Sequence, residues 1–241
     1  MGTKKKVILF IVEGESDRRS LEAILDNYLT PLKVAFDIVH GDITTKFVSS
    51  EIKNQLNKTV QNFCLLNTDY YKLKDIKEIV HIVDMDGAYI DDNDIIFNPA
   101  KSEIIYKLDK ILAKNPKDLK YIHKNKRMVL DLLSRLTEVT VTMINLGVEE
   151  IRPQAIKLPY RIYYFSRNLE HVLHNIISNL TKEQKKDLSN KFEEEYDGDV
   201  EKFLHFISQY AVSGNYSETW DFIKQNKNSL NRHCNIHLFF Q

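Results

Sequence analysis

Two short apolar segments constrain the fold most, because each ends abruptly on acidic residues. "VILFIV" at residues 7–12 is followed by Glu13 and Gly14, and "EIVHIV" at 78–83 is followed by "DMDG". A continuous apolar run rich in β-branched residues is typical of a fully buried strand in a parallel sheet. The sequence therefore predicts two buried strands, each of which is followed directly by acidic residues.

The segments around these runs alternate between helical and strand patterns. Apolar residues recur at helical spacing from about Asp17 to the break at Pro31, and "KVAFDIVHG" at 33–41 predicts a second strand. A helix is expected over 47–62, and the third strand over 78–87. Strand, helix, strand, helix, strand is the order of an α/β domain with a parallel sheet and right-handed crossovers.

The pattern changes after residue 87. We expect an acidic loop at 88–98, then a Lys-rich, mostly helical insertion at about 100–150 in which Ile105, Leu108 and Leu112 share one face. "YRIYYFS" predicts a fourth strand at 160–166, and "RNLEHVLHNIISNL" predicts an amphipathic helix after it.

The last part of the sequence has only helical patterns. It begins with a capping box, Thr181 and Gln184. We therefore expect an α/β domain at 1–180 that includes the helical insertion, with a helical C-terminal region at 181–241 packed on it.

Length and charge exclude few classes of protein. The 241 residues can bury a sizeable core. With 34 basic and 34 acidic residues the formal net charge is zero, which argues against a histone-like polycation but leaves room for local basic patches. Cys64 and Cys234 are expected to be reduced thiols. The first apolar run is too short for a signal peptide and no stretch approaches a membrane span, so we expect a cytoplasmic protein without membrane association.

Acidic side chains follow three of the predicted strands. In an open parallel sheet, ligands bind beyond the carboxyl ends of the strands near a topological switch point. Glu13, Asp84 and Asp86 should meet at that edge, and Glu170 follows the fourth strand. In an extended segment, the spacing of two would put both aspartates on the same side.

The chemistry of such a group indicates a metal site. Clustered carboxylates repel one another unless a cation neutralises them, and hard oxygen ligands suit Mg²⁺ or Mn²⁺. Each acid alone is more simply a solvated surface charge. The expected convergence at one sheet edge is what favours a metal site.

These segments also carry a family resemblance. "VILFIVEGESDRRSLEAIL" together with "VHIVDMDG" resembles the TOPRIM domain of primases, topoisomerases and OLD-family nucleases, with Glu13-Gly14 after the first strand and Asp84-x-Asp86 after the third. "EGESD" most resembles the nuclease branch and adds Asp17, and "FSRNLEHVL" resembles the segment that adds Glu170. The resemblance covers about residues 6–90, and 158–178 more loosely.

The resemblance implies a TOPRIM-like fold and a divalent-metal-dependent nuclease. Asp84 and Asp86 would hold one ion, Glu13 would be a ligand or general base, and Asp17 and Glu170 would support a second ion. The topoisomerases use a tyrosine nucleophile in a separate domain, and none can be singled out among the 12 tyrosines here, so hydrolysis is favoured.

The resemblance also has implications for partners. OLD proteins usually carry an ATPase domain, but no GxxxxGK[ST] motif is present, so this would be a stand-alone TOPRIM protein. Any ATP-driven regulation would come from a protein partner, and a homo-oligomer is an open alternative. Phage defence or DNA repair is the context that the resemblance suggests.

Basic residues near these motifs are candidates for binding nucleic acid, with DNA favoured over RNA. A basic stripe with interleaved aromatic residues can follow a phosphate backbone and stack a base, although a solvated Lys-rich helix face would give the same pattern. The candidates are Arg18, Arg19, Lys124, Lys126, Arg127 and Arg167.

Two other functions share part of the signal. "HIVDMDGAYI" resembles the first motif of haloacid dehalogenase-like phosphatases, in which Asp84 would be the nucleophile and Asp86 the acid or base. That motif usually starts its domain and continues with Thr or Val where this chain has Ala88, and it leaves Glu13 unexplained. The third alternative is a non-catalytic TOPRIM scaffold that binds nucleic acid or protein, against which the complete set of acids argues.

Overall fold

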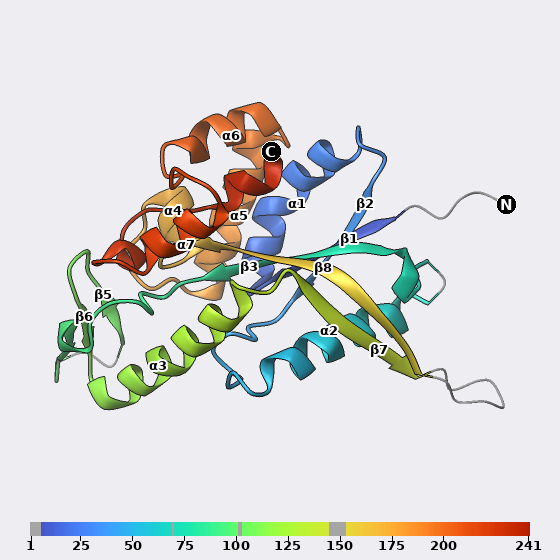
Figure 1. Ribbon diagram of the computed structural model, residues 1–241. Coiled ribbons are helices and arrows are strands. Elements are labelled where there is room, and N and C mark those ends of the chain that lie inside the picture. Colours follow the sequence, from blue (N-terminus) through green and yellow to red (C-terminus); the bar gives the residue numbers. More distant parts are fainter. Residues whose placement is uncertain (1–5, 69, 101–102, 145–152) are drawn as a thin grey trace, which may run out of the picture.

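A five-stranded sheet runs through the middle of the molecule (Figure 1). The computed structural model describes residues 6–68, 70–100, 103–144 and 153–241. The strand order is β2-β1-β3-β8-β7. The strands are β1 (Val7–Val12), β2 (Ala35–His40), β3 (Ile76–Asp84), β7 (Glu138–Ile144) and β8 (Pro153–Phe165). All neighbours pair in parallel except β7, which is antiparallel to β8. The predicted α/β class with a mostly parallel sheet is confirmed.

Helices cover both faces of this sheet (Figure 1). One face is packed by α1 (Glu15–Leu29), α5 (Lys182–Tyr196) and α6 (Val200–Ser208), and the other by α2 (Ile52–Leu66) and α3 (Pro116–Leu133). Successive β1 side chains alternate between two hydrophobic clusters, because side chains of a strand point to opposite faces in turn. Burial on both faces explains why this strand is a continuous apolar run.

The chain order of the strands creates a switch point between β1 and β3. From β1 the chain passes to β2 on one side and then returns to β3 on the other side. The carboxyl ends of β1 and β3 are therefore neighbours, and the crossovers leave that edge in opposite directions. This is the place in an open α/β sheet where a ligand site is expected.

The helical prediction for the start of the insertion is wrong. Ile105–Tyr106 and Ile111–Ala113 are strands β5 and β6, which form a small three-stranded sheet with β4 (Ile95–Phe97). In β6, Ile111 and Ala113 are buried, whereas Leu108 is 58% exposed. The buried positions of β6 therefore follow a period of two, and the helix begins only at Pro116. Residues 101–102 and 145–150 of the expected insertion lie outside the described residues.

Two predictions near the fourth strand also need correction. The strand is much longer than 160–166, because its first half pairs with β7, which the sequence analysis missed. The helix expected over 167–180 is limited to α4 (Leu169–His174). It stops because Asn175 adopts a left-handed conformation with φ 57°, a common way for a helix to end.

The C-terminal region is helical as predicted. Besides α5 and α6 it contains α7 (Tyr216–Ile223) and short 3₁₀ turns at Asn228–Leu230 and Ile236–Phe240; further turns lie at Leu73–Asp75 and Asp92–Asp94. The predicted capping box is present, since the Thr181 and Gln184 side chains each accept a hydrogen bond from the backbone N–H of the other. Cys64 and Cys234 are buried free thiols.

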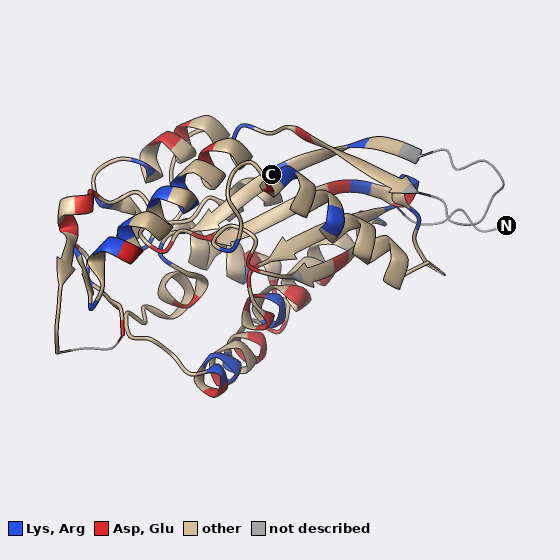
Figure 2. Cartoon of the chain, turned by 90° about the horizontal axis from the view of Figure 1, so that it is seen from below, with Lys and Arg blue, Asp and Glu red and all other residues tan. Residues whose placement is uncertain are grey.

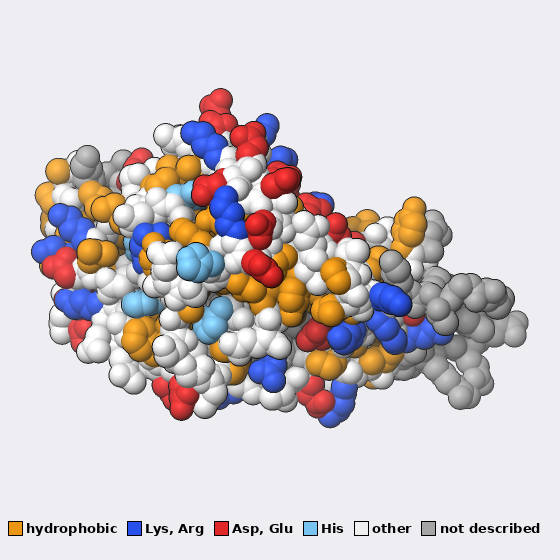
Figure 3. Space-filling view, turned by 90° about the horizontal axis from the view of Figure 1, so that it is seen from above, with side chains coloured by type: hydrophobic (Ala, Val, Ile, Leu, Met, Phe, Trp, Pro, Cys, Tyr) orange, Lys and Arg blue, Asp and Glu red, His pale blue; other side chains and the backbone are white. Residues whose placement is uncertain are grey.

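Charged residues are spread over the molecule. Lys and Arg positions and Asp and Glu positions are scattered over the helices (Figure 2), and side chains of both signs are interspersed with hydrophobic ones on the face seen from above (Figure 3). Of the helices in the described ranges, none combines the length and apolar character needed to cross a membrane.

Candidate metal centre

Glu13 follows β1 directly and Asp84 is the last residue of β3, so both lie at the switch point. Ile11 of β1 is paired with His81 of β3. Glu13 follows Ile11 by two residues, and Asp84 follows His81 by three residues. Neighbouring strands are about 4.8 Å apart, which brings the two carboxylates to the same edge. The strand ends predicted from sequence are thus adjacent in space.

Glu13 is held in a nearly buried position. Its side chain is 12% exposed, and its Oε1 accepts a 2.8 Å hydrogen bond from the Thr44 hydroxyl. The Lys126 ammonium lies 3.8 Å from the same oxygen. Burial, together with the charges of Asp86 and Asp42, outweighs the effect of Lys126 and raises the pKa of Glu13 to about 8.

Asp84 and Asp86 lie on either side of a sharp change in chain direction. Asp84 Oδ1 accepts a 3.1 Å hydrogen bond from the backbone N–H of Leu169. The backbone N–H of Asp86 donates to the carbonyl of Arg167 at 2.7 Å, and its φ is 49°. The extended geometry expected for this pair is therefore wrong at Asp86, because the chain already turns there. Asp86 Oδ2 lies 2.5 Å from Lys126 Nζ.

Asp17 and Glu170 form a second pair of acids beside the first. Asp17 accepts a 2.8 Å hydrogen bond from the backbone N–H of Gly14, and the Ser16 hydroxyl lies 3.4 Å from both carboxylates. Glu170 is 2% exposed and pairs with Lys185 at 2.7 Å. Burial, followed by the charge of Glu170, raises the pKa of Asp17 to about 6.

The pKa of Asp84 is raised by burial and by the charges of all four neighbouring acids. Burial is the largest cause of the raised pKa of Asp84, and the charges of Asp17, Glu13, Asp86 and Glu170 raise this pKa further. These carboxylates are therefore close enough to repel one another in a partly dry environment. We call Glu13, Asp17, Asp84, Asp86 and Glu170 the acidic cluster.

Lys126 is the counter-charge on one side of the acidic cluster. It is 1% exposed, and although burial would lower its pKa, the charges of Asp86 and Glu13 raise it. The ammonium nitrogen is within 4 Å of both carboxylates. The nearby His81 and His123 are kept neutral by burial, with their pKa values lowered to about 3 and about 4.

The basic residues proposed from sequence do not form one surface. Lys126 and Arg167 are buried, which corrects the expectation of a basic stripe on the surface of this part of the chain. Arg167 lies 4.7 Å from the ring centre of Tyr106 and donates to the Ile177 carbonyl at 2.6 Å. On α3 no continuous basic stripe forms, because Lys126 is buried whereas Lys124 is exposed.

The other candidates are closer to solvent. Lys124 is exposed, and Arg127 pairs with Asp92 at 3.1 Å. Arg18 and Arg19 are partly exposed on α1 and each pairs with a glutamate one turn away. Lys185 and Thr44 also contact the acidic cluster, and neither was predicted from the sequence.

The donor chemistry of the cluster fits a hard divalent cation, since every donor is a carboxylate oxygen. Glu170 Oε2 is buried without a hydrogen-bond partner, which is unusual for a charged oxygen. Across the described residues, however, no group of three or more His, Cys, Asp or Glu side chains is already arranged to hold a metal ion. The Lys126 ammonium lies against Glu13 and Asp86 instead, and an ion would have to displace it.

Comparisons with known proteins add no relative. No family model, no curated protein and no solved structure matches this chain. The site therefore has to be interpreted from its own geometry.

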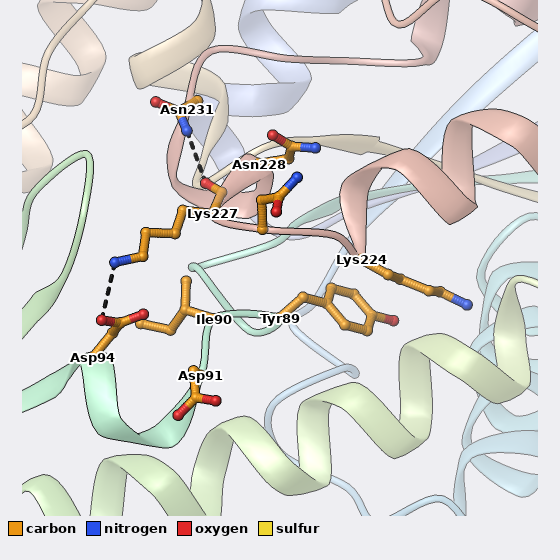
Figure 4. Close-up of a pocket in the computed structure, with 9 residues that line it drawn as sticks. Tyr89, Ile90, Asp91, Asp94, Lys224, Lys227, Asn228 and Asn231 are labelled. Carbon is orange, nitrogen blue, oxygen red and sulfur yellow. Dashed lines mark hydrogen bonds and ion pairs between the residues drawn. The ribbon is translucent and has the colours of Figure 1, made fainter.

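A further hollow lies next to Tyr89 and Asp91, shortly after the Asp86 turn in the sequence (Figure 4). Its volume is about 650 Å³, and Tyr89 and Lys224 line one part of it. Its lysines are already paired: Lys227 Nζ lies 2.9 Å from Asp94 and Lys224 Nζ lies 2.9 Å from Asp131. It offers amide groups, a tyrosine ring and the Asp91 carboxylate.

Proposed function

We propose that this protein is a divalent-metal-dependent phosphodiesterase that acts on nucleic acid, as a TOPRIM-type nuclease. The observation that carries the proposal is the convergence of Glu13, Asp84 and Asp86 at the switch point, with Asp17 and Glu170 beside them. Such a concentration of mutually repelling carboxylates is costly for folding, and a bound cation would remove that cost.

Each part of the acidic cluster has a role in this proposal. Asp84 and Asp86 would hold Mg²⁺ or Mn²⁺, and Asp17 and Glu170 would support a second ion. When bound, the ion neutralises the charge that develops on the phosphate during attack. Glu13 would bind the ion directly or accept a proton from an attacking water. Its raised pKa belongs to the metal-free protein, and the charge of a bound cation would lower it. In the metal-free protein, Lys126 keeps Glu13 and Asp86 close together.

The wider setting of this function remains as the resemblance suggests. We propose DNA rather than RNA as the preferred substrate, a cytoplasmic location, and a place in phage defence or DNA repair. A protein partner or a second copy of the chain could complete the active form.

Cleavage of nucleic acids tests this proposal. Plasmid DNA and single-stranded DNA and RNA oligonucleotides are incubated with the protein in Mg²⁺, Mn²⁺ or EDTA. The comparison uses Asp84→Asn/Asp86→Asn and, as a matched control, Asp187→Asn, which replaces an exposed aspartate on α5. We expect metal-dependent cutting that the double variant loses and the control keeps.

The other two functions are outcomes of the same test. Release of phosphate from a small phosphomonoester, without cutting of any nucleic acid, would replace the nuclease by the phosphatase that uses Asp84 as nucleophile. Binding of nucleic acid without either reaction would indicate the non-catalytic scaffold.

A further inference from the structure

A basic hollow lies between the first turns of α1 and α5. Its volume is about 420 Å³, and its cationic lining residues are Arg19 from α1 and Lys182, Lys185 and Lys186 from α5. Gly14 and Ser16 form another part of the wall. We call this hollow the basic pocket.

The positive charge of the basic pocket is only partly compensated by carboxylates. Lys182, Lys185 and Lys186 are spaced so that they share one face of α5. Glu15, which also lines the pocket, pairs with Arg19 at 3.4 Å. Within the part of the chain that the structure describes, neither Lys182 nor Lys186 has a carboxylate at ion-pair distance, and both side chains are exposed. The pocket therefore attracts anions.

The basic pocket shares a wall with the acidic cluster. Lys185 lines the pocket, and its ammonium lies 2.7 Å from Glu170 Oε1. Ser16 also lines the pocket, and its hydroxyl is 3.4 Å from the same oxygen. An anion in the basic pocket would thus lie next to the carboxylates that we propose to hold the metal.

We propose that the basic pocket binds two neighbouring phosphates of a nucleic-acid strand, next to the phosphodiester that is cut. The identity of this ligand rests on the proposed function, because a strand held at the acidic cluster presents its neighbouring phosphates at the distance of an adjoining pocket. Lysine ammonium groups bind phosphates as point charges without reading base sequence. The basic pocket then positions the strand and contributes salt-dependent affinity.

Binding without cleavage tests this inference. A fluorescein-labelled single-stranded DNA oligonucleotide is titrated in EDTA with Asp84→Asn/Asp86→Asn protein, so that no cutting occurs. To this background we add Lys182→Gln/Lys186→Gln or, as a matched control, Lys53→Gln/Lys58→Gln, exposed lysines of α2 on the other side of the sheet (Figure 1). Loss of two phosphate contacts should weaken binding about 20-fold at ~0.1 M salt and lower the salt slope by about 1.4. The control should leave both unchanged.

The outcomes separate this inference from the proposed function. Equal affinity and equal salt slope of the Lys182→Gln/Lys186→Gln variant and the Lys53→Gln/Lys58→Gln variant would show that the basic pocket does not bind the strand. This conclusion would hold whether or not the protein cuts nucleic acid. Loss of binding in the Lys182/Lys186 pair supports it even if no cleavage is found. Binding of inorganic pyrophosphate that is tighter than that of the oligonucleotide, and lost in the same pair, would replace the strand by a free phosphate compound.

Discussion

A single buried ammonium group sets the charge balance of the acidic cluster. Lys126 is 1% exposed and contacts both Glu13, which follows β1, and Asp86, which follows β3. Burying an ammonium group is costly unless charged partners surround it. Lys126 and a metal ion would therefore compete for the same carboxylates.

Lys126→Met tests this competition. Removal of the charge leaves two carboxylates unpaired, so in EDTA the free energy of unfolding should fall by about 2–4 kcal/mol. Mn²⁺ should restore more stability to the variant than it adds to the wild type, because the ion no longer displaces an ammonium group. Chemical unfolding with and without Mn²⁺ measures both effects. Lys124→Met, at an exposed position of the same helix, is the control, and equal stability of the two variants would contradict this account.

The raised pKa of Glu13 predicts a pH dependence of stability. The pKa rises from 4.5 to about 8 on folding, so the folded protein binds the proton more tightly than the unfolded chain. Stability from this group is complete below pH 4.5 and is lost as the pH rises through 8. Between about pH 7 and 8.5 the metal-free protein should lose on the order of 1 kcal/mol that Glu13→Gln does not lose.

Thermal or urea unfolding in EDTA across this pH range measures that loss. Glu194→Gln, an exposed position on α5, serves as the control and should follow the wild type. A wild-type profile no steeper than that of Glu13→Gln would show that the carboxylate is not desolvated as the structure indicates.

At the scale of elements, the turn after β3 depends on a glycine. Gly87 has φ 67°, and a Cβ there would lie 2.6 Å from Leu230 Cδ2 and 3.0 Å from Ile111 Cδ1. Gly87→Ala should therefore destabilise the protein by about 2 kcal/mol or more, from backbone strain and from the clash. Gly41→Ala is the matched control, since nothing lies within 4 Å of a Cβ there. Urea unfolding that shows equal stability of the two variants would contradict the described turn.

The sequence predicted the strong elements and missed the weak ones. "VILFIV" and "EIVHIV" are mainly apolar and lie in strands that are buried on both faces, so their pattern is unambiguous. By contrast, β7 is an edge strand with the alternating pattern "EVTVTMI". Its pairing with β8 is a tertiary contact that no local sequence pattern indicates. The isoleucines of β5 and β6 fit both a helical and a strand period. Ile111 of β6 packs in one cluster with Leu119 of α3, a tertiary contact that the local pattern does not show.

The acidic residues of the candidate site could be named from sequence, but their counter-charges could not. Strand ends at a switch point bring Glu13 and Asp84 together by topology alone. Lys126 and Lys185 reach the acidic cluster through the packing of α3 and α5, which tertiary contacts determine. One signal was available for Lys126, because it lies in phase with the buried Leu119, His123, Leu130 and Leu133 of α3.

At the scale of the whole molecule, the two helical layers share one sheet. Trp220, the single tryptophan, is buried with the α2 and α3 side of the core, whereas Phe203 of α6 belongs to the cluster on the other side. We expect the layers to unfold together, because each loses its packing surface when the sheet is lost. Urea transitions followed by Trp220 fluorescence and by far-UV circular dichroism should coincide, and separate midpoints would show independent units.

The proposed function depends on binding of a divalent cation by the acidic cluster. Titration of Mn²⁺ followed by electron paramagnetic resonance of the free ion measures this directly in wild type, Asp84→Asn/Asp86→Asn and the Asp187→Asn control. We predict saturable binding by the wild type and the control, and a loss of affinity of at least tenfold in the double variant, as expected when carboxylate ligands are removed. Equal binding by the three proteins, or no binding by any of them, would contradict the metal centre.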